Sequence, residues 1–297
     1  MPSSTRVYIV LLCGLLAVSV AAIFIRFAEA PSLIVAAYRM LLASLVLVPS
    51  ILPSLKRTPL TKQNLGYTLL AGVFLGIHFA TWISSLSYTT VAASVTIVAT
   101  QPIWVALFGW FFLGLAPSLV MLLGVLVAVG GGALIGFGDF SGGSSPLLGD
   151  LLALAGAISG AAYLLLGRSA QKRGLSLNAY VGVAYSVAAV ILLPLPLVTG
   201  LSYTHYPVAT FFWIALLALL PQLIGHTSIN YAMRHLNPTL VATAMLLEPI
   251  GAGLMAIFLF REIPSQTTLI GSLVLLFGVA ITIFASSQVT KPINKPK

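Results

Sequence analysis

Ten stretches of apolar, almost uncharged residues, each about 20 residues long, occupy most of this 297-residue chain. A helix of about 20 such residues crosses the roughly 30 Å hydrocarbon layer of a bilayer, and only a helix or a closed barrel satisfies its backbone there. The pattern, together with a mean hydropathy of +1.09, predicts an all-α integral membrane protein with ten transmembrane helices. The predicted spans are residues 7–27, 33–53, 66–88, 91–113, 119–138, 147–167, 177–199, 208–231, 238–260 and 267–286.

The first span begins after Arg6 and precedes an Ala28-Glu29-Ala30 stretch that resembles a signal-peptidase site. The apolar region of a cleaved signal peptide is only about 7–15 residues long, and residues 7–25 exceed that length. We therefore expect a transmembrane helix here and not a cleaved signal.

The basic residues are distributed unevenly among the predicted connections. Cytoplasmic connections of membrane proteins retain an excess of Lys and Arg, so the more basic side predicts the cytoplasm. If the N-terminus is cytoplasmic, only Arg26 and Arg261 lie outside and Arg39 lies within a span. The remaining eleven are inside: Arg6, Lys56, Arg57, Lys62, Arg168, Lys172, Arg173, Arg234, Lys291, Lys295 and Lys297. The sequence thus predicts a multi-pass protein of the bacterial inner membrane with both termini in the cytoplasm.

Several other functions are not supported by the sequence. The net charge of +9 comes from scattered residues and not from a basic stripe, which argues against nucleic-acid binding. The single cysteine, Cys13, allows no intramolecular disulfide, and no Cys/His spacing indicates a metal site. Gly130-Gly131-Gly132 lacks the strand and the Lys-Ser/Thr ending of a phosphate loop. Hydrolase signatures are also absent, so we expect neither an enzyme nor a cofactor.

A weak internal repeat relates the two parts of the chain. At an offset of 147 residues, the fourth and fifth spans align with the ninth and tenth, and the matches fall on residues that constrain the backbone. The matched pairs are Pro102 with Pro249, Pro117 with Pro264, Ser118 with Ser265, Gly124 with Gly271, and Gly131 with Gly278. Two repeats of five spans, residues 1–140 and 141–297, enter the membrane in opposite orientations, and such inverted repeats enclose a central substrate cavity near the bilayer midplane.

Glu248 stands before Pro249 in the middle of the ninth span, and Gln101-Pro102 occupies the aligned position of the fourth. A charged acid at the centre of a span costs about 2.5–3.5 kcal/mol on insertion scales, so it is expected to face a cavity or a partner. Proline bends a helix and leaves a carbonyl without its donor, which is tolerated beside cavity water. We therefore predict that Pro102 and Pro249 are hinges and that Gln101 and Glu248 face the cavity.

Other polar and aromatic side chains lie within the spans, and two interpretations remain open for most of them. His78 and Trp82 are four residues apart and share a helix face, where His78 either lines the cavity or joins two helices by a hydrogen bond. Trp104 lies one turn beyond Gln101. His226 and Asn230 repeat the four-residue spacing, and Asn230 either faces Glu248 or acts as a packing contact.

The eighth span also contains Tyr231, directly after Asn230. Arg39, in the second span, either extends toward the lipid headgroups or finds a buried partner, which includes an anionic substrate carboxylate.

Taken together, the ten spans in two halves, the motif Ala37 to Leu42 and the segment 258–264 followed by Gly271 resemble the EamA-type branch of the drug/metabolite transporter superfamily. Within it, the chain is most similar to the bacterial aromatic amino-acid exporters of the YddG kind. This resemblance covers nearly the whole chain and implies a central cavity lined by spans one to four and six to nine. By that analogy the cavity-lining spans contain His78, Trp82, Gln101, Trp104, His226, Asn230, Tyr231 and Glu248. We also predict that Tyr38, Arg39 and Tyr163 are cavity residues.

The sequence therefore predicts an exporter of small amphipathic metabolites, and aromatic or other apolar amino acids fit such a cavity best. An exporter of lipophilic cations, drugs or nucleosides is the alternative, in which Glu248 is the counter-ion of a cationic cargo. The expected partners are the small-molecule substrate, membrane lipids and, if Glu248 or the histidines titrate during transport, a proton.

Overall fold

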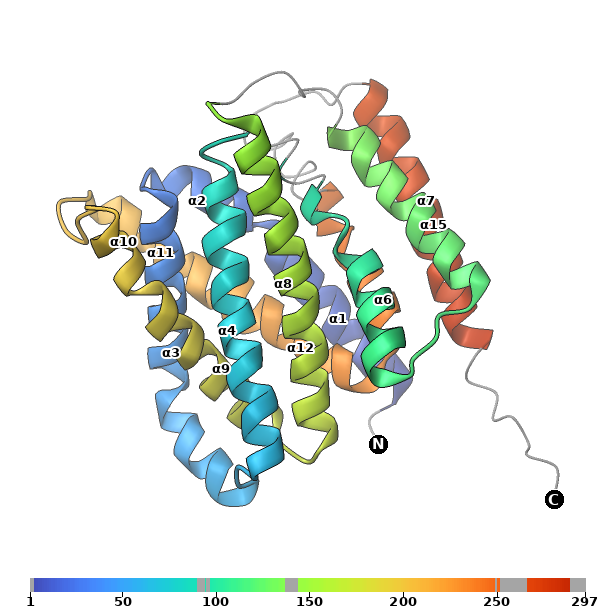
Figure 1. Ribbon diagram of the computed structural model, residues 1–297, viewed down its shortest axis with the longest axis horizontal. Helices are drawn as coiled ribbons and strands as arrows, with labels where there is room; N and C mark the ends of the chain where they lie inside the picture. Colours follow the sequence, from blue (N-terminus) through green and yellow to red (C-terminus); the bar gives the residue numbers. More distant parts are fainter. Residues whose placement is uncertain are drawn as a thin grey trace.

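The structure is a computed structural model, and it describes residues 3–89, 94, 97–136, 144–248, 250–251 and 266–288. Within these ranges the chain forms helices and no strands (Figure 1). The first half contains α1 (Ser4–Ser19), α2 (Ala21–Ala28), α3 (Ser32–Arg57), α4 (Lys62–Ser85), α6 (Gln101–Leu113) and α7 (Leu119–Gly136). The second contains α8 (Pro146–Lys172), α9 (Leu177–Leu192), α10 (Pro194–Val198), α11 (Val208–Leu217), the π-helix η2 (Ala218–His226), α12 (Thr227–His235), α13 (Pro238–Met245) and α15 (Gln266–Gln288).

Seven of the predicted spans are confirmed as helices long and apolar enough to cross a membrane. They are the first, second, third, sixth, seventh, eighth and tenth: Ser4–Ala28, Ser32–Arg57, Lys62–Ser85, Pro146–Lys172, Leu177–Val198, Val208–His235 and Leu269–Ser286. The fourth and fifth contain the shorter apolar helices Gln101–Leu113 and Leu119–Leu134. The ninth is described only as far as residues 250–251, so the total of ten stays a prediction.

Helix α4 shows how the sequence sets the start of a span. The Thr61 hydroxyl accepts a hydrogen bond from the Asn64 N–H (3.2 Å), and the Asn64 side-chain oxygen accepts one from the Thr61 N–H (2.8 Å). This reciprocal capping box satisfies two donors that the first turn of a helix leaves unpaired. The helix therefore begins at the polar residues 61–64, and the apolar run that follows enters the membrane.

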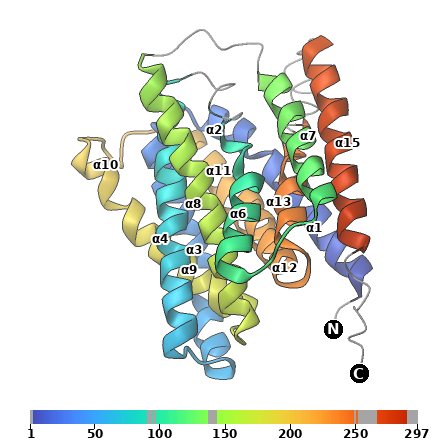
Figure 2. The same ribbon diagram turned by 45° about the vertical axis from the view of Figure 1, so that its right-hand side comes forward.

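The helices pack in pairs that join the two halves. Helix α4 packs along α8, α3 along α9, α1 against η2 and α12, and α7 along α15. The pair α7 and α15 stands at one edge of the molecule in both views (Figures 1 and 2). These are the fifth and tenth spans, the two that the family resemblance leaves out of the cavity lining.

The pairing of α7 with α15 depends on glycines that the repeat had matched. A Cβ atom added at Gly131 would lie 2.3 Å from the Leu275 nitrogen and 2.7 Å from the Gly271 oxygen. One added at Gly278 would lie 2.3 Å from the Ala128 nitrogen and 2.7 Å from the Gly124 oxygen. Because residue numbers rise along α7 as they fall along α15, the two helices are antiparallel, and their backbones touch where side chains are missing.

The fourth and ninth spans are both interrupted, at positions 147 residues apart. Residues 99–100 form a turn before α6, and residues 246–247 form a turn after α13. Pro102 consequently lies in the first turn of α6, where its missing N–H is no loss, and not at a bend in a continuous helix as we expected. Pro249 lies outside the described residues.

Candidate functional site

A small cavity of about 50 Å³, which we call the central cavity, contains six of the eleven predicted cavity residues. Its walls come from spans one to four, eight and nine. The lining residues are Val18, Ala21, Arg39, His78, Trp82, Val98, Gln101, His226, Met245 and Glu248. The structure therefore brings Arg39, His78, Trp82, Gln101, His226 and Glu248 together from five separate spans.

Arg39 is buried in the cavity wall, with only 1% of its surface exposed. Its Nε donates a hydrogen bond to Oε1 of Gln222 (2.9 Å), and its guanidinium carbon lies 4.3 Å from the centre of the Phe79 ring. A cation over an aromatic face is attracted to the ring, and the effect is larger where water is absent. Of the two interpretations of Arg39, the structure supports the buried partner and excludes an extension toward lipid headgroups.

Glu248 supplies the opposite charge. It lines the same cavity as Arg39, and the two side chains attract each other electrostatically across it. A carboxylate and a guanidinium that share a cavity lower each other's cost of burial. The cavity thus offers one anionic and one cationic group to a bound molecule.

His78 and Trp82 form an aromatic wall on α4. Their rings stack with centroids 5.7 Å apart and an interplanar angle of 21°, as the four-residue spacing predicts. His78 Nδ1 lies 2.8 Å from the Gly156 oxygen; a carbonyl only accepts, so Nδ1 carries the proton. The Trp82 indole N–H is buried without a partner among the described residues, which leaves a donor for a ligand.

Gly160 on α8 gives His78 and Gln101 room to approach each other. A Cβ atom at Gly160 would lie 2.9 Å from His78 Nδ1 and 3.1 Å from Gln101 Nε2. The absence of a side chain on α8 is therefore a condition for the shape of the cavity.

Phe79 and Gln222 are the central residues that the sequence interpretation missed. Phe79 is fully buried and contacts His226 edge-on (5.6 Å, 69°) as well as Arg39. Gln222 follows Pro221 inside η2 and is held also by its backbone oxygen, which accepts from the Tyr185 hydroxyl (3.5 Å). A polar residue beside a proline within a span is the same signal that singled out Gln101 and Glu248, and it would have found Gln222.

Asn230 and Tyr163 lie in a separate buried polar cluster on α12 and α8. The Asn230 side-chain nitrogen donates to the Tyr163 hydroxyl and to the His226 backbone oxygen (2.7 Å). Gln171 donates to the Asn230 backbone oxygen (3.1 Å). Of the two interpretations of Asn230, the structure favours the packing contact, because its side chain bonds to α8 and does not line the central cavity with Glu248.

Tyr38, Trp104 and Tyr231 also lie away from the central cavity. The Tyr38 hydroxyl donates to the Tyr203 backbone oxygen (2.9 Å), near the loop that precedes α11. The Trp104 indole N–H donates to Thr100 Oγ1 (3.3 Å), and the Tyr231 ring lies 4.5 Å from that of His235. Their predicted role at the substrate site stays a prediction.

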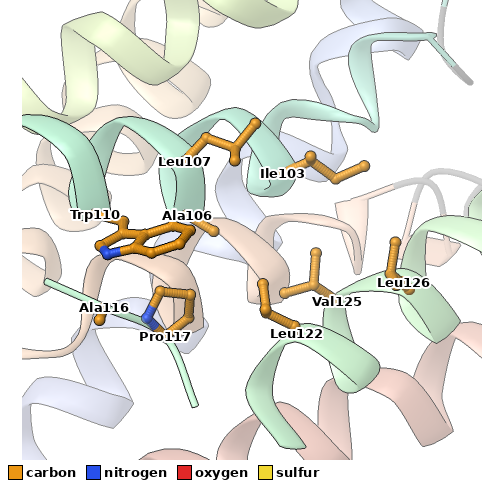
Figure 3. Close-up of a pocket in the computed structure, with 9 residues that line it drawn as sticks. All are labelled: Ile103, Ala106, Leu107, Trp110, Ala116, Pro117, Leu122, Val125 and Leu126. Carbon is orange, nitrogen blue, oxygen red and sulfur yellow. The ribbon is translucent and has the colours of Figure 1, made fainter. Parts of the chain in front are cut away.

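A larger pocket of about 230 Å³ lies between α6 and α7 (Figure 3). Its lining residues are all apolar: Ile103, Ala106, Leu107, Trp110, Ala116, Pro117, Leu122, Val125 and Leu126. The indole N–H of Trp110 is the single polar side-chain group among these nine residues, which is too few to orient a hydrophilic substrate. Among the described residues, no three His, Cys, Asp or Glu side chains converge to hold a metal ion.

The sequence matches the profile of the EamA-like transporter family twice, over residues 5–137 and 147–284. The chain belongs to this family. It is therefore a multi-pass membrane protein of a transporter family, as the resemblance predicted.

Relatives and a solved structure agree with this assignment. An uncharacterized transporter from Archaeoglobus fulgidus is 26% identical over 231 residues, which cover 74% of this chain and 75% of the relative. One from Clostridium kluyveri is 21% identical over 268 residues, 86% of this chain and 84% of the relative. A crystal structure with 16% identity superposes with a TM-score of 0.80 over 97% of this chain and 100% of the other, which shows a shared fold.

Proposed function

We propose that this EamA-family transporter exports small amphipathic metabolites, above all aromatic and other apolar amino acids, across a bacterial inner membrane by alternating access. The observation that carries the proposal is that Arg39 and Glu248 face one central cavity. A free amino acid has one ammonium and one carboxylate group. Glu248 is positioned to bind the ammonium and Arg39 the carboxylate, and charge-assisted hydrogen bonds of this kind are the strong ones.

The remaining wall suits an apolar or aromatic side chain. His78 and Trp82 present stacked rings to the cavity, and Phe79 supports them from behind. Aromatic rings attract one another in offset or edge-on arrangements by about 0.5–1.5 kcal/mol beyond burial. The unpartnered Trp82 N–H adds a donor for the substrate carboxylate.

The central cavity must enlarge to bind such a molecule. Its volume of about 50 Å³ holds one or two waters at about 30 Å³ each, whereas ligand pockets usually measure about 300–1,000 Å³. The described conformation is therefore too narrow at this site to hold the substrate. The helix breaks at residues 99–100 and 246–247 adjoin Gln101 and Glu248, so movement at these breaks would open the cavity and reposition its polar groups together.

The packing pattern supports two inverted halves at residues 1–140 and 141–297. If each span is replaced by the span at the same position in the other half, the contact of the first span with the eighth (α1 with η2 and α12) becomes that of the sixth with the third (α8 with α4). Both contacts are present, and the pairs α3–α9 and α7–α15 are each converted into themselves. Helix α1 begins and α15 ends on the side where α3 leads into α4 and α8 into α9 (Figures 1 and 2). Those connections are basic, which supports cytoplasmic termini.

The alternative cargoes fit these groups less well. A lipophilic cation would pair with Glu248 but would meet the buried guanidinium of Arg39 in the same cavity. A nucleoside has no carboxylate for Arg39. The zwitterion alone uses both charges.

Flux in proteoliposomes tests the proposal. Vesicles that contain the purified transporter and unlabelled amino acid are expected to accumulate labelled phenylalanine, tryptophan or leucine by counterflow. Arg39→Gln and Glu248→Gln should abolish the signal, because each removes one of the two charged contacts. Arg57→Gln, an exposed arginine at the α3 terminus, is the matched control and should transport normally.

Each single substitution leaves the other charge buried without compensation, which costs several kcal/mol and threatens folding. The double variant Arg39→Gln/Glu248→Gln is neutral and is expected to fold, as judged by size-exclusion chromatography, but not to transport. Normal counterflow in the double variant, or the absence of flux for every amino acid in the wild type, would remove the proposed substrate class. Flux of a lipophilic cation that Glu248→Gln alone abolishes would instead support the other cargo.

Direction and coupling are tested in the same vesicles. For an exporter, inside-out membrane vesicles should take up substrate, and right-side-out vesicles should release it. An imposed pH gradient that changes the accumulated amount would show that a proton accompanies the substrate.

A further inference from the structure

A long apolar groove runs over α8, between α4 and α6, away from the central cavity. In both views α8 lies between these two helices (Figures 1 and 2). The groove has a volume of about 540 Å³ and is almost entirely aromatic and aliphatic. Its lining residues are Tyr67, Phe74, Phe108, Phe112, Leu113, Ile158, Ala162, Leu165, Leu166 and Ser169.

One end of this groove is cationic. The exposed guanidinium of Arg173 lies 4.4 Å from the centre of the Tyr67 ring and donates to the Ser169 backbone oxygen (3.3 Å). Both partners line the groove, so the charge is fixed at its mouth. Lys172, also exposed, is the neighbouring residue.

No acid neutralises this end in the part of the chain that the structure describes. The acids there are Glu29, Asp150 and Glu248. Glu29 follows the last residue of α2, Asp150 lies near the N-terminus of α8 whereas Arg173 follows its C-terminus, and Glu248 lines the central cavity. Asp150 and Arg173 are 23 residues apart on one helix, or about 34 Å at 1.5 Å per residue. The mouth of the groove therefore attracts an anion.

The length of the groove matches one leaflet of a bilayer. Along α8 its lining extends from Ile158 to Ser169, a rise of about 16 Å. Half of a hydrocarbon layer of roughly 30 Å is nearly the same length. When the middle of α8, near Ile158, lies at the bilayer midplane, the basic end of the groove lies where the headgroups of one leaflet begin.

We propose that this groove binds one anionic phospholipid of the inner leaflet, with an acyl chain along α8 and its phosphate at Arg173. The planar guanidinium is suited to phosphate oxygens, and its contact with Tyr67 holds it in place. The site is independent of the transported substrate, and only its assignment to the inner leaflet rests on the orientation proposed above.

Lipid retention measured by native mass spectrometry tests the site. The wild type is exchanged into detergent with equal amounts of phosphatidylglycerol and phosphatidylcholine of the same acyl chains. We expect phosphatidylglycerol to be retained roughly fivefold more, as one basic contact near a membrane surface provides. Arg173→Gln should abolish the preference, and Arg57→Gln, an exposed arginine outside the groove lining, should retain it.

A second variant tests the acyl-chain part. Ala162→Phe fills the groove and should lower the retention of both lipids, while size-exclusion chromatography reports whether the protein remains folded. Leu166→Ala, which empties part of the same groove, is used if Ala162→Phe fails to fold, and it should weaken retention of both lipids too. Equal retention of the two lipids by the wild type, or equal losses in Arg173→Gln and Arg57→Gln, would overturn the proposal, since the effect would then be a general surface charge.

Discussion

The contact between α7 and α15 makes Gly131 a position where one added methyl group meets the backbone of the opposite helix. In Gly131→Ala the new Cβ would lie 2.3 Å from the Leu275 nitrogen and 2.7 Å from the Leu275 Cα and the Gly271 oxygen. All three are backbone atoms, so no side-chain rotation relieves the overlap. The two helices must separate by about 1 Å to restore a van der Waals distance.

The cost follows from the loss of this close packing. Overpacking a well-packed interior costs about 1–3 kcal/mol. Alanine in place of glycine stabilises a helix by up to about 1 kcal/mol, so this gain must be separated from the packing cost. Gly130→Ala is the matched control, because it has the same helical gain and nothing lies within 4 Å of its new Cβ. At roughly 2–4 °C per kcal/mol, Gly131→Ala should unfold about 2–12 °C below Gly130→Ala.

Thermal unfolding in one detergent, followed by the loss of the monodisperse size-exclusion peak, measures this difference. Gly278→Ala tests the same interface from α15, since its Cβ would lie 2.3 Å from the Ala128 nitrogen. Once one substitution has separated the helices, the second should cost less, so the double variant should be less destabilised than the sum. If Gly131→Ala unfolds at the temperature of Gly130→Ala, the close antiparallel contact does not exist in the membrane protein.

Two further predictions concern the polar groups beside the cavity. Gln222→Leu removes the acceptor of Arg39 Nε and should lower the free energy of unfolding by about 1.5–3 kcal/mol. Gln222→Glu keeps an acceptor oxygen and should keep the stability of the wild type. Equal unfolding temperatures for the two variants would refute this role of Gln222. Asn230→Leu should lower the free energy of unfolding by about 1–3 kcal/mol, because the Asn230 side chain bonds to Tyr163. The substrate concentration for half-maximal flux should stay the same, since Asn230 does not line the central cavity. A large rise in that concentration would place Asn230 at the substrate.

Six of the eleven residues that the sequence assigned to the cavity line it, because a charged or polar side chain within a membrane span costs free energy unless it faces the protein interior. Arg39 and Glu248 are each the lone charge well inside a long apolar run, and the cost of lipid exposure directs both to the interior. His78 and Trp82 followed from the helical period, and their stacked rings confirm it. These inferences needed only the chemistry of single residues and the spacing along one helix.

Other residues depended on packing between helices, which a single sequence does not specify. Asn230 is one turn beyond His226 on the regular helix α12, yet its side chain bonds to Tyr163, because α12 packs against α8 at that level. Phe79 is one of many apolar side chains in its span, and only the packing of α3 against α4 brings its ring to Arg39. The breaks at residues 99–100 and 246–247 likewise replace the continuous, proline-bent helices that hydropathy alone predicts.

The two halves share a scaffold but not a charge pattern, and this difference has a consequence for transport. Gln101 and Glu248 occupy aligned positions beside aligned helix breaks, and both line the cavity, but only the second is an acid. Arg39 comes from the first half. Under the function proposed above, a zwitterion would bind in one orientation, with its ammonium toward the second half and its carboxylate toward the first. Because each half would contribute one charge, separation of the halves would break at least one of the two contacts, and under the proposed function the opening of the cavity would then favour the release of the substrate.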